Sequence, residues 1–450
     1  MWHLFLKWTS RSHLLLVMIS LVILLPGISH AQDAASPLTE TLDPAPVVEW
    51  MNLFYRLVES EAVSAPGAAR LYAYAGITTY ESLLPGMPTN NTLAGQIWHM
   101  PDMPLPEEDV VYDWLSAHNG AMAALTRGLF PDAKALNVAA IDDLRQSSIE
   151  ARQAEVGADM VERSLAFGES LAEVILRWAG EDGYADTRGL DYTLEPRLGG
   201  WVLTTEGTTP VEPYWGQLRP FTLEFSSDCA VYPNMDFDLD PESTFYLQAV
   251  EVMETGRRLT EEQKATARFW VDTPGITGTP AGHWMSIAGQ LGDRLHLTLD
   301  RVAEAYAMTG IAVGDAFISA WWLKYQVNLL RPETYIHANI RRTWAPYIQS
   351  PAFPEYPSGH SVVSGAASEV LTGLFGAVAF TDETHLIFDH EPLQRAFLSF
   401  EHAASEAAIS RLYGGIHFRE AIENGLRQGR CIGDTALRNI RLNPIRQGGD

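Results

Sequence analysis

Apolar residues recur at intervals of three and four along most of the chain, and this spacing predicts α-helices. Stretches in which β-branched residues alternate with other residues are few and short, and the best candidate is a small hairpin at Trp201–Thr205. The pattern therefore predicts an all-α fold. The predicted helices are Val47–Ala62, Gly67–Leu84, Ala135–Arg145, Ala158–Ala179, Pro241–Gly256, Thr260–Trp270, Trp284–Ala307, Val313–Leu330, His360–Leu374, Leu393–Leu412 and Phe418–Ile440.

Two long segments, Pro85–Glu107 and Tyr184–Asp240, interrupt the helical pattern. Both are rich in Pro, Gly and aromatic residues, which predicts ordered loops that wrap the helices and not free linkers. The chain has 450 residues, of which 46% are hydrophobic, so it is long and apolar enough to bury a sizeable core. We expect an N-terminal helical region at 32–310 and a C-terminal helical bundle at 311–450, packed as one unit.

The first residues are typical of an export signal. Lys7 and Arg11 precede an apolar run from Leu14 to Leu25, and small residues follow at Ser29 and Ala31. We therefore predict a signal peptide at residues 1–31 and a mature protein that is periplasmic or secreted. No later stretch reaches about 18 uninterrupted apolar residues, so we expect no membrane association after cleavage. An uncleaved anchor is the alternative.

The formal net charge is −25, and removal of the predicted signal makes it more negative because Lys7 and Arg11 are lost. This charge argues against nucleic acid and anionic membranes as partners. An acidic protein that binds an anion must concentrate its cations locally, so clusters of Arg, Lys and His are informative. The two cysteines, Cys229 and Cys431, can pair in an oxidising compartment or remain as two unpaired structural residues.

Three short segments carry the candidate chemistry, and the first is Lys324–Pro332. Lys324 and Arg331 are seven residues apart, which places both cations on one face of the predicted helix that Pro332 ends. Such a face suits an anion. Two solvated surface cations are the alternative for this pair taken alone.

The second segment, Pro357–His360, has the sequence Pro-Ser-Gly-His and precedes an apolar helical run. It is therefore expected at a helix N-terminus, where unpaired backbone N–H groups and the helix dipole favour an anion. Ser358 adds a hydroxyl donor, Gly359 lets the backbone approach closely, and His360 can exchange a proton with a bound oxygen. An ordinary Ser N-cap beside an incidental His is the alternative.

The third segment is Ser410–His417. Arg411 and His417 would point about 240° apart on an unbroken helix, and Gly414-Gly415 supplies a break that lets both face one point. Arg can donate two hydrogen bonds to an oxyanion, and an imidazole nitrogen can bond its central atom. A helix-ending turn before the next helix is the alternative. Together, the three segments predict a pocket for a tetrahedral oxyanion.

The order and spacing of these segments resemble a pattern shared by vanadium-dependent haloperoxidases and phosphatidic acid phosphatase type 2-like acid phosphatases. The resemblance covers residues 324–417 closely. Trp321 and Phe353 also look like the aromatic positions near the halide site of fungal-type vanadium chloroperoxidases. The resemblance implies helical bundles with the oxyanion between helices of the C-terminal bundle.

The resemblance also implies the roles of the residues. Lys324, Arg331, Ser358, Gly359, His360 and Arg411 would hold vanadate as cofactor, and His417 would bind vanadium. His360, His417 and Lys324 would be catalytic, with hydrogen peroxide, a halide and a small organic acceptor as partners. One position departs from the pattern: Ala421 stands where the family has an Asp that orients the His. Glu420, Glu423 or a backbone carbonyl are the candidate replacements.

Three hypotheses remain. A vanadium-dependent haloperoxidase is favoured, because the helical region before Lys324 is long and Ala421 disfavours a His nucleophile. An exported acid phosphatase, in which His417 attacks phosphorus, is the alternative on the same scaffold. A non-catalytic anion-binding protein is the third. The remaining histidines are expected to be structural or surface residues; His283 could line the pocket, and nothing in the spacing shows whether Asp272 orients His360.

Overall fold

The computed structural model describes residues 35–194, 196–390 and 394–444, and the predicted signal at residues 1–31 lies outside them. The described part from Ser36 onward forms one compact unit, made of fourteen α-helices and one two-stranded antiparallel ribbon. The all-α prediction is confirmed. The elements are α1 (Ala45–Ser60), α2 (Ala65–Leu83), α3 (Trp114–Leu129), α4 (Ala135–Val156), α5 (Ala158–Gly180), α6 (Thr244–Arg257), α7 (Glu261–Phe269), α8 (Thr279–Arg294), α9 (Leu299–Val327), α10 (Pro332–Asn339), α11 (Gly359–Phe375), β1 (Phe380–Asp382), α12 (Thr384–Ile387), β2 (Arg395–Phe397), α13 (Phe400–Gly414) and α14 (Arg419–Asn439).

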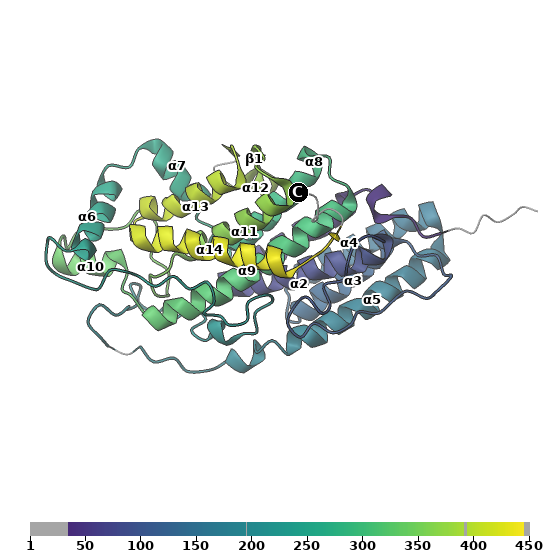
Figure 1. The fold of residues 1–450 in the computed structure, drawn as a ribbon, viewed down its shortest axis with the longest axis horizontal. Helices are drawn as coiled ribbons and strands as arrows, with labels where there is room; N and C mark the ends of the chain where they lie inside the picture. The colour runs from purple at the N-terminus through teal and green to yellow at the C-terminus, as the bar shows by residue number, and fades with distance from the viewer. Residues whose placement is uncertain (1–34, 195, 391–393, 445–450) are drawn as a thin grey trace, which may run out of the picture. The chain divides into compact units, whose positions relative to one another are not determined.

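The long helix α9 lies at the centre of the unit (Figure 1). Almost all of its residues from Leu299 to Lys324 are buried, as expected for a helix that is apolar on every side. It packs against α2 and α8 on the N-terminal side of the sequence and against α11 and α14 on the C-terminal side. The predicted division between residues 310 and 311 therefore lies inside a helix that both regions share.

A buried carboxylate on α9 anchors one of the long loops. Asp315 accepts hydrogen bonds from the backbone N–H groups of Phe221 and Thr222, at 2.6 and 2.8 Å. The same loop donates from Trp201 N to Asn328 O at the end of α9. These hydrogen bonds hold the loop between α5 and α6 against the central helix α9, as the composition of the loop predicted.

Four helix predictions were wrong in their boundaries. The predicted helix Leu393–Leu412 begins only at Phe400, because Arg395–Phe397 form β2, and the predicted helix Ala135–Arg145 continues to Val156. The predicted helix Trp284–Ala307 is interrupted after Arg294, where His296 adopts a φ of +51°, and α9 begins at Leu299. Apolar spacing continues across this break, so periodicity alone could not reveal it. The predicted helix Val313–Leu330 is the second half of α9, which ends at Val327.

The predicted hairpin at Trp201–Thr205 was also wrong, because these residues belong to no strand and only Gly200 beside them forms an isolated bridge, to Leu329. The ribbon instead pairs β1 with β2, with Phe380 opposite Phe397. Helices α3 and α10 were not predicted. Helix α3 mixes Ser, His, Asn and Gly into its buried surface, which weakens the apolar spacing that identifies a helix.

Cys229 and Cys431 form a disulfide across 202 residues of sequence. Of the two alternatives left open by the sequence, pairing is therefore the one observed. The bond joins the 184–240 loop to α14 and adds a covalent link between that loop and the C-terminal bundle.

None of the helices among the described residues has both the length and the apolar composition that a bilayer span requires.

Helices α11 and α14 approach closely through small residues (Figure 1). A Cβ added at Gly429 would lie 2.1 Å from the carbonyl oxygen of Val362, and Gly425 and Gly433 lie one turn away on the same face. This contact places the start of α14, and with it the segment that carries His417, against the start of α11.

Substitution of Gly429 by Ala should destabilise the protein by about 1–3 kcal/mol, because the backbone of α11 cannot move away without loss of packing. Denaturant or thermal unfolding of the purified variant measures the change. Gly180→Ala is the matched control, since a Cβ at that helix terminus meets nothing within 4 Å. Equal stability of the two variants would contradict the close packing described for α11 and α14.

Candidate functional site

The predicted residues meet at a cavity of about 440 Å³. Its lining contains Gly359, His360, Arg411 and His417, which we call the polar wall. The aromatic side chains of Trp321 and Phe353 also line it, together with apolar residues from α2, α9 and the 348–353 segment. Lys324, Arg331 and Ser358 are each 0% exposed and lie behind the polar wall. The structure thus brings every predicted site residue to the cavity or directly behind it.

Arg331 reaches this site by a route that the sequence did not indicate. Helix α9 ends at Val327 because Asn328 adopts a left-handed conformation with φ of +47°. Arg331 is then the extended N-cap residue of α10, whose first residue is Pro332. The prediction that Lys324 and Arg331 share a face of one helix was therefore wrong, although both cations converge on the site.

The Pro-Ser-Gly-His turn lies at a helix N-terminus, as predicted. Ser358 is the N-cap of α11, and its hydroxyl oxygen accepts from Ser361 N. Ser358 N in turn donates to the carbonyl oxygen of Ala421 at 3.1 Å. The backbone N–H groups of Gly359 and His360 belong to the first turn of α11, where they have no intrahelical acceptor. They are available to an anion in the cavity.

The break between Arg411 and His417 is also as predicted. Helix α13 ends at Gly414, and Gly415 adopts the left-handed conformation with φ of +79°. Ile416 N donates back to Arg411 O, which closes the turn. Both side chains then line the same cavity.

The ammonium group of Lys324 donates its hydrogen bonds to backbone carbonyl groups of the protein. Its Nζ donates to the carbonyl oxygens of Pro354 and Glu355 at 3.0 Å each, and to that of Pro357. These bonds hold the loop that leads into α11. Burial, and then the charge of Arg331, lower the pKa of Lys324 well below its ordinary value.

The contacts of His417 determine its tautomer. Arg331 Nη1 lies 3.1 Å from His417 Nε2, and a guanidinium can only donate, so Nε2 is the acceptor. The proton therefore resides on Nδ1, which donates to Glu355 Oε1 at 2.9 Å. Burial, and then the charges of Arg331 and Lys324, lower the pKa of His417 well below its ordinary value. His417 is thus a neutral imidazole whose Nε2 lone pair faces the cations.

Glu355 is the residue that sequence reasoning missed. It occupies the role that the absent Asp at Ala421 left open, and neither Glu420 nor Glu423 contacts His417. Its Oε1 also accepts from Phe418 N at 2.9 Å, and burial raises its pKa to about 7 against the opposing charge of Arg331. The only available signal was its place two residues before Pro357, and nothing in the spacing linked it to His417.

This partner removes one argument drawn from the sequence. Ala421 was taken to disfavour a His nucleophile, but Glu355 holds His417 in a single tautomer without the Asp. The departure at Ala421 therefore does not separate a phosphatase from a haloperoxidase.

Two polar side chains of the wall have nitrogen atoms that are buried without a hydrogen-bond partner among the described residues: His360 Nε2 and Arg411 Nε. Arg411 does donate from Nη1 to the carbonyl oxygen of Trp270. Burial, and then the charge of Arg411, lower the pKa of His360 well below its ordinary value, while Asp272 acts in the opposite direction. Buried donors and acceptors of this kind are normally paired, so they indicate the position of a polar ligand.

Trp321 and Phe353 form the aromatic side of the site. Their ring centroids lie 4.9 Å apart, and Lys324 Nζ lies 5.1 Å from the centroid of Phe353. The guanidinium carbon of Arg331 lies 4.9 Å from the same ring. The two rings therefore shield the buried cations from water on the cavity side, and both cations make cation–π contacts.

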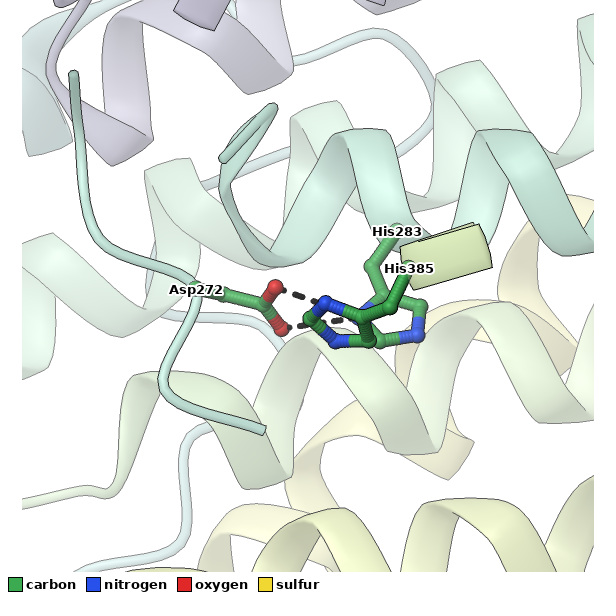
Figure 2. Close-up of side chains that lie close together, drawn as sticks. All are labelled: Asp272, His283 and His385. Carbon is green, nitrogen blue, oxygen red and sulfur yellow. Dashed lines mark hydrogen bonds and ion pairs between the residues drawn. The ribbon is translucent and has the colours of Figure 1, made fainter. Parts of the chain in front are cut away.

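A second buried cluster, which was not predicted, contains Asp272, His283 and His385 (Figure 2), and Asp272 lines the same cavity as the polar wall. His283 Nδ1 contacts both oxygens of Asp272, at 3.0 and 3.1 Å, and His283 Nε2 contacts Asp382 Oδ2 at 2.7 Å. His283 does not line the cavity, whereas Asp272 does. The ligand atoms of Asp272, His283 and His385 lie within 4.8 Å of one another, so these three residues have the composition and spacing of a metal site.

Comparisons with known proteins indicate the family of the chain. A sequence model of the VCPO second helical-bundle domain matches residues 339–443. No curated protein sequence gave a match.

Solved structures match the whole fold. A bacterial vanadium-dependent iodoperoxidase is 33% identical, over 91% of this chain and 99% of that one, with a TM-score of 0.83. The holo form of a bacterial vanadium-dependent chloroperoxidase is 16% identical, over 90% and 94%, with a TM-score of 0.60. Its apo form is 15% identical, over 85% and 94%, with a TM-score of 0.61. The last two likenesses concern the fold alone.

Removal of the Glu355 carboxylate should weaken oxyanion binding. Glu355→Ala leaves the Nδ1–H of His417 without its acceptor, and loss of such an orienting partner costs about 10–100-fold in affinity. Glu355→Gln should retain part of the affinity, because an amide oxygen can still accept from Nδ1. Titration of each purified variant with vanadate measures the effect. Glu420→Gln is the control, and a loss there equal to that of Glu355→Ala would contradict the assigned partner.

Oxyanion binding should also take up a proton through Lys324. A bound anion raises the lowered pKa of this ammonium group, so between the free and bound pKa values binding is accompanied by protonation and weakens as pH rises. Calorimetry with phosphate in buffers of different ionisation enthalpy measures the uptake. Lys324→Arg, which stays protonated, should show less uptake, and equal uptake in both proteins would exclude Lys324 as the source.

Proposed function

The chain belongs to the vanadium-dependent haloperoxidases, and on this premise we propose that it oxidises a halide with hydrogen peroxide, using vanadate held at the polar wall. The observation that carries the proposal is the neutral His417, which lines the cavity and whose unprotonated Nε2 accepts from the buried Arg331. The product would be a hypohalous acid equivalent, which can halogenate a small organic acceptor. Vanadate, when bound, supplies a Lewis-acid centre that activates hydrogen peroxide without changing oxidation state.

The residues present fit a vanadate ion. Its oxygens would meet the N–H groups that begin α11, the guanidinium of Arg411 and the two unpartnered nitrogens of the described wall, His360 Nε2 and Arg411 Nε. Lys324, Arg331 and Ser358 lie behind the polar wall. The two cations would balance the remaining negative charge of the ion, and the Ser358 hydroxyl would hydrogen-bond to it. His417 Nε2 would bind vanadium in place of its hydrogen bond from Arg331, since an imidazole with a fixed Nδ1–H is a suitable metal ligand.

The proposed catalytic residues are His360, His417 and Lys324. A neutral His360 can take a proton from hydrogen peroxide as it enters and return it to a departing oxygen. His417 keeps Nε2 unprotonated because Glu355 holds the proton on the other nitrogen, and Nε2 must release Arg331 Nη1 before it can bond another atom. Lys324 contributes positive charge, and to donate a hydrogen bond to peroxide its ammonium must release one of its three carbonyl acceptors.

Iodide is the halide we expect to be oxidised first, because the solved structure that shares 33% identity is an iodoperoxidase. Trp321 and Phe353 are the proposed halide neighbours, since both line the cavity beside the polar wall. The cavity, at about 440 Å³, is far larger than a halide ion needs. Its apolar lining from Val211, Ile348 and Ala352 suits a small organic acceptor.

We also propose that the protein is exported and works in the periplasm or outside the cell. The disulfide between Cys229 and Cys431 supports this, because such bonds persist in oxidising compartments. The N-terminal pattern at residues 1–31 agrees with it.

An acid phosphatase is the second candidate, and the contact between Glu355 and His417 is the observation that favours it. A His nucleophile needs a fixed tautomer and a cationic phosphate site, and both are present. The long helical half that matches the haloperoxidase structures favours the first candidate.

The test is halide oxidation by the purified protein after reconstitution with vanadate. Iodide should give triiodide with hydrogen peroxide, and His360→Ala should lower the rate by about a hundredfold or more, the contribution expected of a general acid–base group. His402→Gln, at an exposed position on α13, should leave the rate unchanged.

Monochlorodimedone with bromide or chloride extends the same assay to the other halides. Hydrolysis of p-nitrophenyl phosphate that vanadate inhibits, without oxidation of any halide, would instead establish the phosphatase.

A further inference from the structure

The cluster of His283, Asp272 and Asp382 touches the polar wall through the short segment Phe269–Asp272, which we call the strap. Arg411 donates to the carbonyl oxygen of Trp270 in the strap. Asp272 lines the same cavity as Arg411 and His360, and its charge acts to raise the pKa of both. The strap therefore presents two acceptors to the cationic side of the cavity. Because Arg411 donates to Trp270 O, the contacts that hold the strap in place also help to position Arg411.

His283 holds the strap at two points. Its Nδ1 binds the Asp272 carboxylate, and its ring stacks on the indole of Trp270 with centroids 4.5 Å apart and an interplanar angle of 21°. A third contact comes from His385, whose Nε2 lies 2.7 Å from the Phe269 carbonyl oxygen. Asp272 itself adopts a φ of +44°, a conformation that few residues other than Gly take up without support.

Asp382 holds His283 from the other side. It lies at the end of β1, is 0% exposed, and accepts from Thr384 N with its second oxygen. Both ring nitrogens of His283 therefore face carboxylates at hydrogen-bond distance, which requires a proton on each nitrogen. Burial acts to lower the pKa of His283, but the charges of Asp272 and Asp382 outweigh it and raise this pKa to about 10.

We propose that His283, held by Asp382, is a positioning residue that fixes the strap and thereby sets Arg411 and the Asp272 carboxylate for oxyanion binding. The contacts of Asp382 with His283 and of His283 with Asp272 keep a carboxylate on the same cavity as Arg411, whose guanidinium also has an acceptor at Trp270 O. The inference rests on the proposed function, because it concerns the same oxyanion.

A metal ion is the competing explanation of these contacts. It would bind Asp272, His283 and His385, which are arranged as ligands (Figure 2). The hydrogen bonds favour a His283 that is protonated on both nitrogens over one that binds a metal. Asp272 occupies Nδ1 of His283 and Asp382 occupies Nε2, so a metal at either nitrogen would displace an existing contact. Arg411 already supplies positive charge next to Asp272. Metal analysis of the purified protein decides between the two.

The experiment measures vanadate affinity, with phosphate in a parallel titration, for wild type, His283→Gln and Asp382→Asn. We expect His283→Gln to weaken binding by about 10–100-fold, the range for loss of a group that orients a ligand-binding residue. The matched control is His118→Gln, another fully buried histidine, which contacts Thr79. It should bind vanadate as wild type does, even if its melting temperature falls by a similar amount.

A folded His283→Gln protein with wild-type affinity would overturn the proposal, as would a stoichiometric divalent metal in the wild-type cluster. If His283→Gln does not fold, Asp382→Asn decides, and unchanged affinity there overturns the proposal equally. Binding is measured without any halide. A wild type that binds vanadate but oxidises no halide refutes the proposed function alone, whereas a wild type that binds neither anion refutes both.

Discussion

The structure depends on keeping a group of positive charges buried next to a cavity. Lys324 and Arg331 are fully inaccessible to solvent and Arg411 nearly so, and burial lowers the pKa of each. A buried charge is costly unless it is paired and hydrogen-bonded. The protein meets this cost with backbone carbonyls, with Glu355 and Asp272, and with the rings of Trp321 and Phe353. An oxyanion in the cavity would complete the neutralisation.

The irregular backbone of the site follows from the same constraint. Carbonyl oxygens that are already paired within a helix are poor additional acceptors, so the cations need backbone outside regular structure. The segment Pro351–Pro357 supplies it: Lys324 takes the carbonyls of Pro354, Glu355 and Pro357, and Arg331 takes that of Phe353. The next residue, Ser358, then caps α11 and turns the chain into the helix whose N-terminus faces the cavity.

Rigid helices carry these loops to one place. Helix α9 supplies Lys324 at its end, and the close contact of α11 with α14 fixes the His417 segment against the Ser358 turn. Polar contacts then set the tautomer of His417 from one side and the position of Arg411 from the other. The two carboxylates involved, Glu355 and Asp272, come from loops and not from the helices that carry the cations.

The sequence by itself determined the helical class, most helix positions and which residues gather at the cavity, because these depend on local spacing: apolar periodicity, the Ser358 cap and the Gly415 break. It did not show that Arg331 leaves α9, because apolar residues continue through Leu330 and obscure Asn328, a residue type that does tolerate the left-handed turn. Nor could it find Glu355 as the partner of His417, or the contact of His283 with Asp382. Those pairs are separated by 62 and 99 residues, and only packing of distant segments brings them together. Tertiary structure therefore decided how the pocket residues are charged and oriented, since hydrogen bonding and burial depend on neighbours in space.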